Sequence, residues 1–271
     1  MKKKLLYILG WIGYVLAIFF VAISFFWNLF LANGRAKKYL SGKKNYFVEQ
    51  RYIWIEKLIN RIFFAFRIKI VDNNLQFLSN SPSLIVFNHK SNLDGIIMAK
   101  LLIKNYRENN GNFRFVIVVK KEVVRVKLFR NILALIDTVY IDRDNIRQQF
   151  QLYNTQNNLI KQKTSIVLSP EGTRISEDEF GEFKSGAFKI AFDNMIYIQP
   201  VVIYGTLGRM NKNSKNKCKG PIYVNFLKPK KPFDFHMNNI DYFSETLKNE
   251  MEKNYFAIKG NIKNKKKNIF N

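Results

Sequence analysis

Cysteine and histidine are scarce in this chain of 271 residues, which contains one cysteine, Cys218, and two histidines, His89 and His236. A single cysteine cannot form a disulfide within the chain, so a disulfide-stapled fold is excluded. One cysteine and two histidines far apart in sequence also argue against a zinc site built from these residue types. Any chemistry must therefore depend on a histidine, carboxylates, lysines or arginines.

Acidic residues are few as well: 20 Asp and Glu stand against 45 Lys and Arg, which leaves a formal net charge of +25. Such an excess indicates an anionic partner, and nucleic acid, an acidic membrane surface and a phosphorylated or acidic-carrier substrate all fit it. The chain is also rich in Asn, Lys, Ile and Phe, a composition that codon bias in an AT-rich genome produces. Charge alone therefore does not choose a partner.

Charged side chains are absent from residues 5–32, "LLYILGWIGYVLAIFFVAISFFWNLFLA". As a helix this segment would be roughly 42 Å long, and a bilayer core is about 30 Å thick. The run is longer and more aromatic than the apolar part of a cleavable signal peptide, so we expect a retained anchor in the cell membrane. A basic cluster at residues 35–44 follows it and favours a catalytic domain on the cytoplasmic side. The sequence leaves open whether the helix spans or re-enters the bilayer.

The rest of the chain divides by composition. We expect a membrane anchor with a basic linker at 1–44, an amphipathic interfacial helix at 45–68, a catalytic domain at 69–258 and a frayed basic tail at 259–271. In the second segment apolar residues such as Tyr52, Ile55 and Ile59 recur at helical spacing. That helix could lie on anionic lipid or pack on the domain core, and the spacing fits both.

Strand-like and helix-like segments alternate from residue 67 onward. This order predicts an α/β fold, a mixed sheet flanked by helices and preceded by the anchoring helix. The expected strands lie at 67–72, 83–87, 113–119, 136–143, 165–168, 197–205 and 221–227. The expected helices lie at about 92–105, 145–163, 186–192 and 240–258, with a further basic helical stretch that leads to residue 136.

The first motif, "NHKSNLD", follows the apolar run that ends at Phe87. A residue at the carboxyl end of such a strand faces the crevice where α/β proteins bind ligands. If Asp94 holds one ring nitrogen of His89, the other can take a proton from a hydroxyl group. Alternatively, Ser91 and Asp94 form a capping box at a helix start, and the spacing does not separate the two readings.

The second motif, "SPEGTR", follows the apolar run 165–168 and should therefore emerge at the same sheet edge. Gly172 permits close approach of the backbone to a ligand, and Arg174 carries a guanidinium that matches phosphate geometry. Lys184, in "FKSG", adds a further cation. By itself this motif is equally typical of an ordinary turn with a solvated arginine.

Together the two motifs resemble the lysophosphatidic acid acyltransferase family, whose pattern is Asn-His, four residues, Asp, and later Glu-Gly-Thr-Arg. The resemblance covers roughly residues 70–205 and includes "KKEV" at 120–123 and Asp142-Arg143. The chain departs from the family in two places. It lacks the usual Pro and Gly between those landmarks, and a second Pro just before Pro200. Both departures put acyl-chain and acceptor preference in doubt.

The resemblance implies a glycerolipid acyltransferase-like fold and transfer of a fatty acyl group from a thioester to the 2-hydroxyl of 1-acylglycerol-3-phosphate, which gives phosphatidic acid for phospholipid synthesis. It implies His89 as general base, oriented by Asp94, with no metal and no bound cofactor. It also implies a set of substrate-binding residues. Asn88 would support the loop, and Glu171, Gly172, Thr173 and Arg174 would surround the glycerol phosphate. Further positive charge near that phosphate would come from Lys121, Arg143 and Lys184.

The partners implied are acyl-CoA or acyl-carrier protein as donor, lysophosphatidate as acceptor, and anionic membrane lipid, with no nucleic acid. Two alternatives stay open. The first is a related acyltransferase that acts on glycerol-3-phosphate or another lysophospholipid. The second is a non-catalytic membrane protein that binds anionic lipid, which would leave the pairing of the two motifs unexplained.

Overall fold

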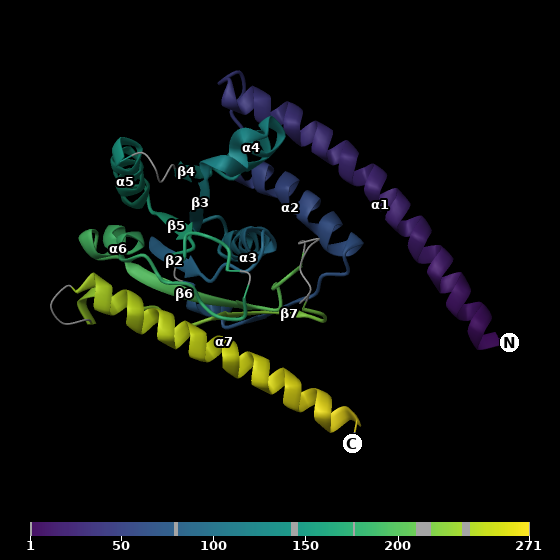
Figure 1. Ribbon diagram of the computed structural model, residues 1–271. Coiled ribbons are helices and arrows are strands. Elements are labelled where there is room, and N and C mark those ends of the chain that lie inside the picture. Colours follow the sequence, from purple (N-terminus) through teal and green to yellow (C-terminus); the bar gives the residue numbers. More distant parts are fainter. Residues whose placement is uncertain are drawn as a thin grey trace. The chain divides into compact units, whose positions relative to one another are not determined.

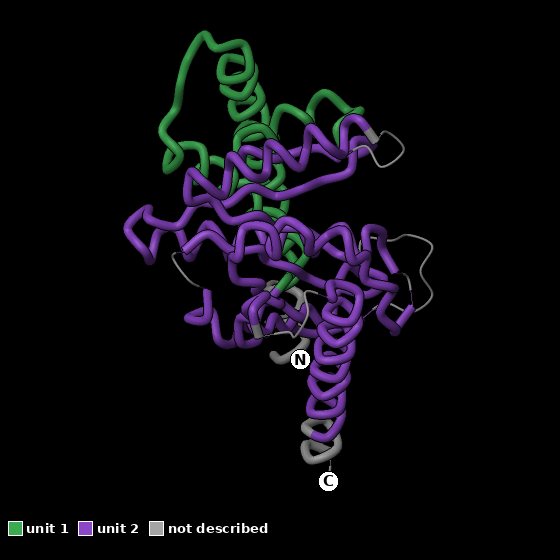
Figure 2. The backbone as a smooth tube through the Cα atoms, turned by 90° about the vertical axis from the view of Figure 1, so that its left-hand side faces the viewer, with its two compact units in different colours: residues 1–68, 124–136 green, residues 69–123, 137–271 purple. Residues whose placement is uncertain are grey.

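A computed structural model describes residues 2–78, 81–141, 146–175, 177–209, 218–234 and 239–270 (Figure 1). The chain forms two compact units (Figure 2). The first comprises residues 1–68 and 124–136, and the second comprises residues 69–123 and 137–271. The first boundary falls where the amphipathic helix was expected to give way to the catalytic domain. The functional division into four segments stays a prediction.

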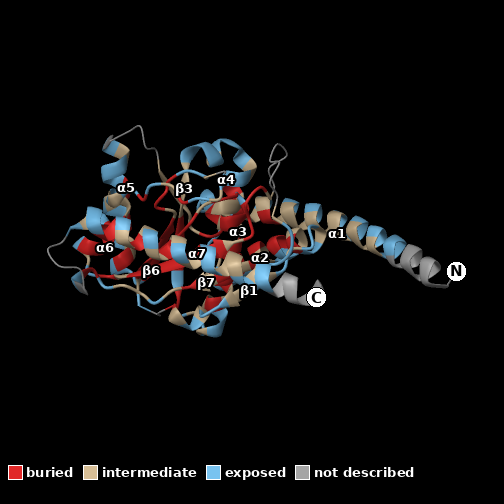
Figure 3. Cartoon of the chain, turned by 60° about the horizontal axis from the view of Figure 1, so that its bottom comes forward, coloured by how far each residue is buried: buried red, intermediate tan, exposed pale blue. Residues whose placement is uncertain are grey.

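The first unit is helical and consists of α1 (Lys2–Leu40), α2 (Val48–Ala65) and α4 (Lys127–Ala134). The part of α1 from Trp11 to Leu40 is long and apolar enough to cross a membrane. It runs antiparallel to α2, because Tyr14 Oη donates to the Ala65 carbonyl at 3.2 Å and Arg61 Nε donates to Ser24 Oγ at 2.9 Å. Figure 3 shows exposed residues along α1, and many of them are large and apolar, among them Trp11, Phe19, Phe26, Trp27 and Phe30.

The apolar stripe of α2 is buried inside the protein. Tyr52, Ile55, Ile59 and Phe63 are all less than 9% exposed. Phe66, which continues the same spacing just after the helix, is 65% exposed. An interfacial role of residues 45–68 stays a prediction.

The second unit is built on a seven-stranded sheet in the order β1-β7-β6-β2-β5-β3-β4. Neighbouring strands are parallel except β6 and β7, which are antiparallel. The predicted mixed α/β sheet is therefore confirmed. Its strands are β1 (Ile70–Asn73), β2 (Ser83–Phe87), β3 (Arg114–Lys120), β4 (Val139–Ile141), β5 (Thr164–Leu168), β6 (Tyr197–Tyr204) and β7 (Ile222–Phe226).

The helices of the second unit cover this sheet. They are α3 (Leu93–Glu108), α5 (Ile146–Lys161), α6 (Lys189–Asp193) and α7 (Ile240–Phe270), with short 3-10 turns η1 (Leu75–Phe77), η2 (Lys121–Arg125), η3 (Ser185–Ala187) and η4 (Pro232–Asp234). The last helix corrects one expectation: the sequence predicts a helix that ends near residue 258 and then a frayed tail, whereas α7 continues to Phe270.

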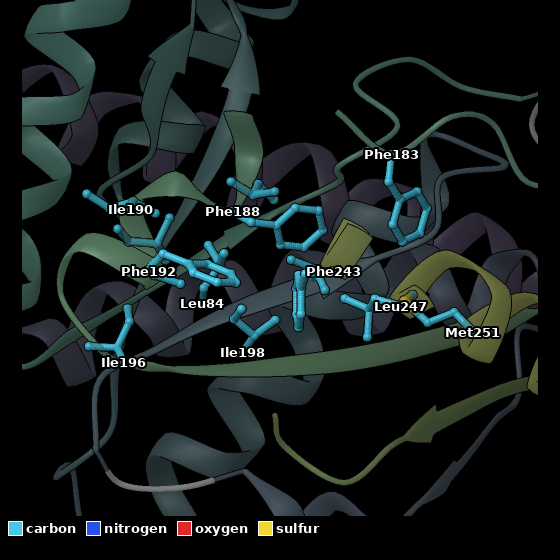
Figure 4. Packing of buried hydrophobic residues seen from close by; sticks show 14 of the residues in the cluster. Leu84, Phe183, Phe188, Ile190, Phe192, Ile196, Ile198, Phe243, Leu247 and Met251 are labelled. Carbon is cyan, nitrogen blue, oxygen red and sulfur yellow. The ribbon is translucent and has the colours of Figure 1, made fainter. Parts of the chain in front are cut away.

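The main core lies between one face of the sheet and helices α5, α6 and α7 (Figure 4). Leu84 of β2 and Ile198 of β6 are fully buried there against Phe188 and Phe243, whose rings are 5.2 Å apart. Each such side chain contributes about 1.5–3 kcal/mol on burial. This packing fixes the central strands, whose ends carry the two motifs.

The carboxyl ends of β2 and β5 lie side by side at one edge of the sheet. The two strands are parallel, and Val86 pairs with Leu168. The first motif leaves β2 one residue later, and the second leaves β5 directly after Leu168. The expectation that both motifs emerge at the same edge is therefore confirmed. Strands β6 and β3, parallel to β2 and β5 respectively, end at this edge as well.

Candidate active site

His89 lies just beyond the end of β2, and its ring is held by Asp94 at the start of α3. The distance from His89 Nδ1 to Asp94 Oδ2 is 3.0 Å, and the histidine side chain is 25% exposed whereas that of Asp94 is fully buried. A carboxylate can only accept a hydrogen bond, so Nδ1 carries the proton. The other ring nitrogen, Nε2, is then left with its lone pair, as a general base requires.

Asp94 also holds the turn that carries His89. Its Oδ2 accepts hydrogen bonds from the backbone N–H groups of Lys90 and Ser91, both at 2.7 Å. The bond from Ser91 is the half of a capping box in which the acidic side chain reaches back. The other half is absent, because the Asp94 N–H donates to the Ser91 carbonyl at 3.0 Å instead of to its hydroxyl. One carboxylate therefore both orients the imidazole and fixes its loop.

The second motif contacts His89 through the backbone. Glu171 Oε2 accepts from the His89 N–H at 2.7 Å, although the two residues are 82 positions apart. The Ile175 N–H donates to the His89 carbonyl at 2.9 Å. The two motifs predicted to act together thus meet at His89, whose N–H is bonded by Glu171 of the second motif and whose carbonyl is bonded by Ile175, the residue directly after that motif.

Glu171 is turned into the protein and not toward the outside of the loop. It is 4% exposed, and its second oxygen accepts from the Gly181 N–H at 3.3 Å. Burial raises the pKa of this carboxyl to about 7, against the opposing effect of its N–H donors and of the Lys90 ammonium. Both carboxylate oxygens of Glu171 thus accept backbone N–H groups, and its expected contact with the acceptor stays a prediction.

The raised pKa of Glu171 predicts a pH-dependent stability that Glu171→Gln removes. The carboxyl's ordinary pKa is 4.5 and its folded value is about 7, so the folded protein binds the proton more tightly than the unfolded chain does. The resulting stabilisation is complete below the ordinary pKa and is lost as pH rises through 7, by about 3 kcal/mol. Glutamine keeps one acceptor oxygen and does not ionise, so the free energy of burying it does not vary with pH. Thermal unfolding in detergent micelles should show that the Tm of wild type falls relative to that of the variant as pH rises from 4.5 through 7. A Tm difference between the two proteins that does not change with pH would contradict the prediction.

In the rest of the second motif Gly172 is buried, and only Thr173 and Arg174 are exposed. Gly172 has a left-handed backbone with φ of 67°, and its N–H donates to the Ser169 carbonyl at 3.2 Å. A residue with a Cβ is strained in this conformation, which explains the glycine. Thr173 and Arg174 follow with exposed side chains. A phosphate group can therefore reach the Arg174 guanidinium from solvent.

The other predicted substrate-binding residues are spread around this edge. Asn88 is fully buried, and its amide bonds both backbone groups of Ile203 in β6, at 3.0 and 2.7 Å. The Lys184 N–H donates to the Pro170 carbonyl at 2.9 Å, while its exposed ammonium pairs with Glu182. Lys121 opens η2 directly after β3. Arg143 lies outside the described residues, as does Asp142.

Lys90 is the site residue that sequence reasoning missed. It is 4% exposed, its ammonium donates to the Glu179 carbonyl, and it lies 5.2 Å from the Phe180 ring centroid. Burial lowers the pKa of this lysine, whereas the neighbouring carboxylates, Glu171 first, oppose that shift. Lys90 thus compensates buried negative charge directly beside His89. No local signal marks it, because its partners come from a loop almost ninety positions later.

The described residues contain no group of three or more His, Cys, Asp or Glu side chains arranged to hold a metal ion. What the geometry brings together is a histidine, a buried carboxylate that holds its ring, and the exposed Arg174.

Comparison with known proteins gives consistent results. The family described as Acyltransferase matches residues 67–204. A probable 1-acyl-sn-glycerol-3-phosphate acyltransferase of Mycoplasma genitalium is 39% identical over 68% of this chain and 67% of its own length. One from Mycoplasma pneumoniae is 33% identical over 81% of this chain and 84% of its own length. The crystal structure of the 1-acyl-sn-glycerophosphate acyltransferase PlsC from Thermotoga maritima has the same fold, with a TM-score of 0.59 at 17% identity over 86% of this chain and 97% of that chain.

Proposed function

Since this chain belongs to the acyltransferase family, we propose that it transfers a fatty acyl group from an acyl thioester to the 2-hydroxyl of 1-acylglycerol-3-phosphate. The product is phosphatidic acid, and the donor is acyl-CoA or acyl-carrier protein. The names of the related proteins support this acceptor. The observation that supports the chemistry is the His89–Asp94 pair, at 3.0 Å, beside the second motif, which ends in the exposed Arg174.

The steps follow from the position of the free Nε2 of His89. This nitrogen removes the proton of the acceptor hydroxyl as the oxygen attacks the thioester carbonyl. The carbon–sulfur bond then breaks, and the imidazolium donates its proton to the leaving thiolate. Until then Asp94 stabilises the imidazolium. The ester bond replaces the thioester bond, so no acyl-enzyme and no further reactant are needed.

The direct test is acyl transfer from labelled acyl-CoA, and separately from acyl-carrier protein, to lysophosphatidate in mixed micelles. We expect labelled phosphatidate with at least one donor. A parallel panel of glycerol-3-phosphate and lysophospholipids with larger head groups tests the alternative acceptors. That alternative stays open because the chain lacks the Pro and Gly that are usual between "KKEV" and Asp142-Arg143, and the second Pro that is usual before Pro200. Transfer only to a panel member would overturn the proposed acceptor while keeping the reaction class.

Arg174 is proposed to bind the acceptor phosphate. A charge-assisted hydrogen bond of this kind contributes about 1.5–3 kcal/mol, so Arg174→Ala should raise KM for lysophosphatidate about 10- to 100-fold with little change in kcat. Steady-state kinetics with a varied acceptor concentration measures this. Arg114→Ala is the matched control, because Arg114 is an exposed arginine at the opposite end of β3. Equal KM values for the two variants would remove Arg174 from the phosphate site.

The first unit is proposed to hold the enzyme on the membrane from which the acceptor comes. One side of α1 is covered by α2 and the other is apolar and exposed, as in a helix that enters one leaflet and returns. In this proposal residues 1–44 and 45–68 serve membrane attachment, 69–258 the reaction and 259–271 an additional basic contact. The catalytic unit is placed on the cytoplasmic side, where activated acyl donors are made. Protease digestion of sealed vesicles of both orientations tests the side: cleavage only in right-side-out vesicles would contradict it.

A further inference from the structure

The segment that leads into α4 combines exposed apolar and basic side chains. Val126 is 52% exposed and Phe129 is 55% exposed. Arg125, Lys127 and Arg130 alternate with them and are exposed as well. We call these five residues the α4 patch. Their arrangement has no role in the reaction derived above.

The opposite side of α4 is firmly attached within the first unit. Asn131 is 6% exposed, and its amide donates to Asn33 Oδ1 of α1 at 2.8 Å. The Leu135 carbonyl at the end of α4 accepts from Arg51 Nη1 of α2 at 3.2 Å. These contacts fix which side of α4 faces inward, so the α4 patch is held outward and is not a surface that folds back into the unit.

We propose that the α4 patch inserts into the surface of an anionic bilayer, with Val126 and Phe129 among the upper acyl chains and the three cations on lipid headgroups. This rests on the membrane location given under Proposed function. The charges are complementary to acidic lipid, and basic residues that flank apolar ones are the composition of interfacial segments. The patch also lies on a helix that packs on α1, and α1 carries the exposed side chains of Phe26, Trp27 and Phe30.

The position of the patch in the chain gives it a use in the reaction. Strand β3 ends at Lys120, at the sheet edge that carries His89, and the α4 patch begins at Arg125 after the short turn η2. A patch seated in lipid would tether that edge close to the layer that contains the acceptor. The expected benefit is therefore in capture of a membrane-embedded acceptor, and not in the chemical step.

Depth-dependent quenching tests the insertion without reference to activity. In a full-length Cys218→Ser background, Phe129→Cys carries an environment-sensitive fluorophore, and the protein is reconstituted in phosphatidylcholine vesicles with or without phosphatidylglycerol. The matched control is Phe150→Cys, since Phe150 on α5 is 66% exposed. We expect spin-labelled lipid to quench the probe at position 129 several-fold more than the probe at 150, and more strongly when phosphatidylglycerol is present.

Two results would overturn the proposal. One is equal quenching of both probes by spin-labelled lipid, together with equal quenching by aqueous iodide. The other is a spectral change at position 129 caused by added acyl-carrier protein and not by vesicles, because it would assign the patch to an acidic protein. Both fluorescence measurements can be made even if the chain transfers no acyl group. Failure of the insertion proposal is therefore distinguishable from failure of the proposed function.

Kinetics provides the second measurement. Phe129→Asp should lower kcat/KM about tenfold for lysophosphatidate embedded in anionic vesicles and leave it unchanged for a short-chain, monomeric lysophosphatidate in solution. Phe150→Asp should change neither. Equal loss on both acceptors would mean that Phe129 supports the fold or the chemistry, and the proposal would be wrong.

Discussion

His89→Ala is expected to lower kcat for phosphatidate formation by about 10²- to 10⁴-fold, because the acceptor hydroxyl would lose the base that removes its proton. The fold should be preserved, since the bonds of His89 to Glu171 and Ile175 are made by its backbone and alanine keeps them. The measurement is single-turnover transfer from labelled acyl-CoA to lysophosphatidate in mixed micelles, with Tm recorded for each protein.

Two matched controls accompany this variant. His236→Ala replaces the only other histidine, which lies outside both motifs and outside the described residues, and should retain activity. Cys218→Ala should retain it as well, because the proposed mechanism has no thiol nucleophile. Full activity of folded His89→Ala would mean that the first motif is only a helix start, and loss of activity in folded Cys218→Ala would replace the mechanism by one with an acyl-enzyme.

Asp94→Asn is expected to lower kcat by about 10²-fold or more with little change in KM or Tm. The Asp94 oxygen that bonds His89 also accepts from the Lys90 and Ser91 N–H groups. An asparagine that keeps its carbonyl oxygen in that position preserves the loop but removes the charge that stabilises the imidazolium. The other oxygen, Oδ1, is buried and has no partner among the described residues, so an amide in its place breaks no bond.

Asp94→Ala separates the two roles of this carboxylate. It should lower both kcat and Tm, because two buried backbone donors, on Lys90 and Ser91, lose their acceptor, at about 1–3 kcal/mol each. A pH–rate profile of Asp94→Asn completes the comparison, since loss of the charge should change the ionisation that limits the acid side. If asparagine lowered Tm as much as alanine but left kcat of the folded protein unchanged, Asp94 would be a loop cap only.

The order and type of the main elements could be predicted from the sequence, because the pattern of apolar residues within each segment indicates how that segment is buried. Residues 84–87 and 166–168 are continuous apolar runs, as expected for strands covered on both faces, and they form most of β2 and β5. The same rule placed both motifs at the carboxyl ends of strands. The end of α7 was wrong because a lysine-rich, polar stretch carries no apolar periodicity from which a helix could be predicted.

The roles of individual site residues depended on partners far away in sequence. Glu171 in "PEGTR" has the composition of a ligand-binding turn, yet its carboxylate bonds the backbone of His89 and Gly181. Lys90 reads as a solvated loop lysine, yet it is buried over an aromatic ring. Neither fact is encoded locally, since each needs β2 and β5 to be neighbours and the loop after residue 176 to fold back.

By itself the sequence determined the family, the alternation of strands and helices, the single histidine at a strand end and the apolar N-terminal helix, because these are properties of contiguous residues. Only the tertiary structure decided that β2 lies between β5 and β6, that Asp94 serves both the imidazole and its loop, and that α4 joins α1 and α2 in a separate unit. The physical reason is that strand order and buried hydrogen bonds are chosen by the packing of the whole chain. A short pattern records which groups need a partner, and only the fold decides which partner each one receives.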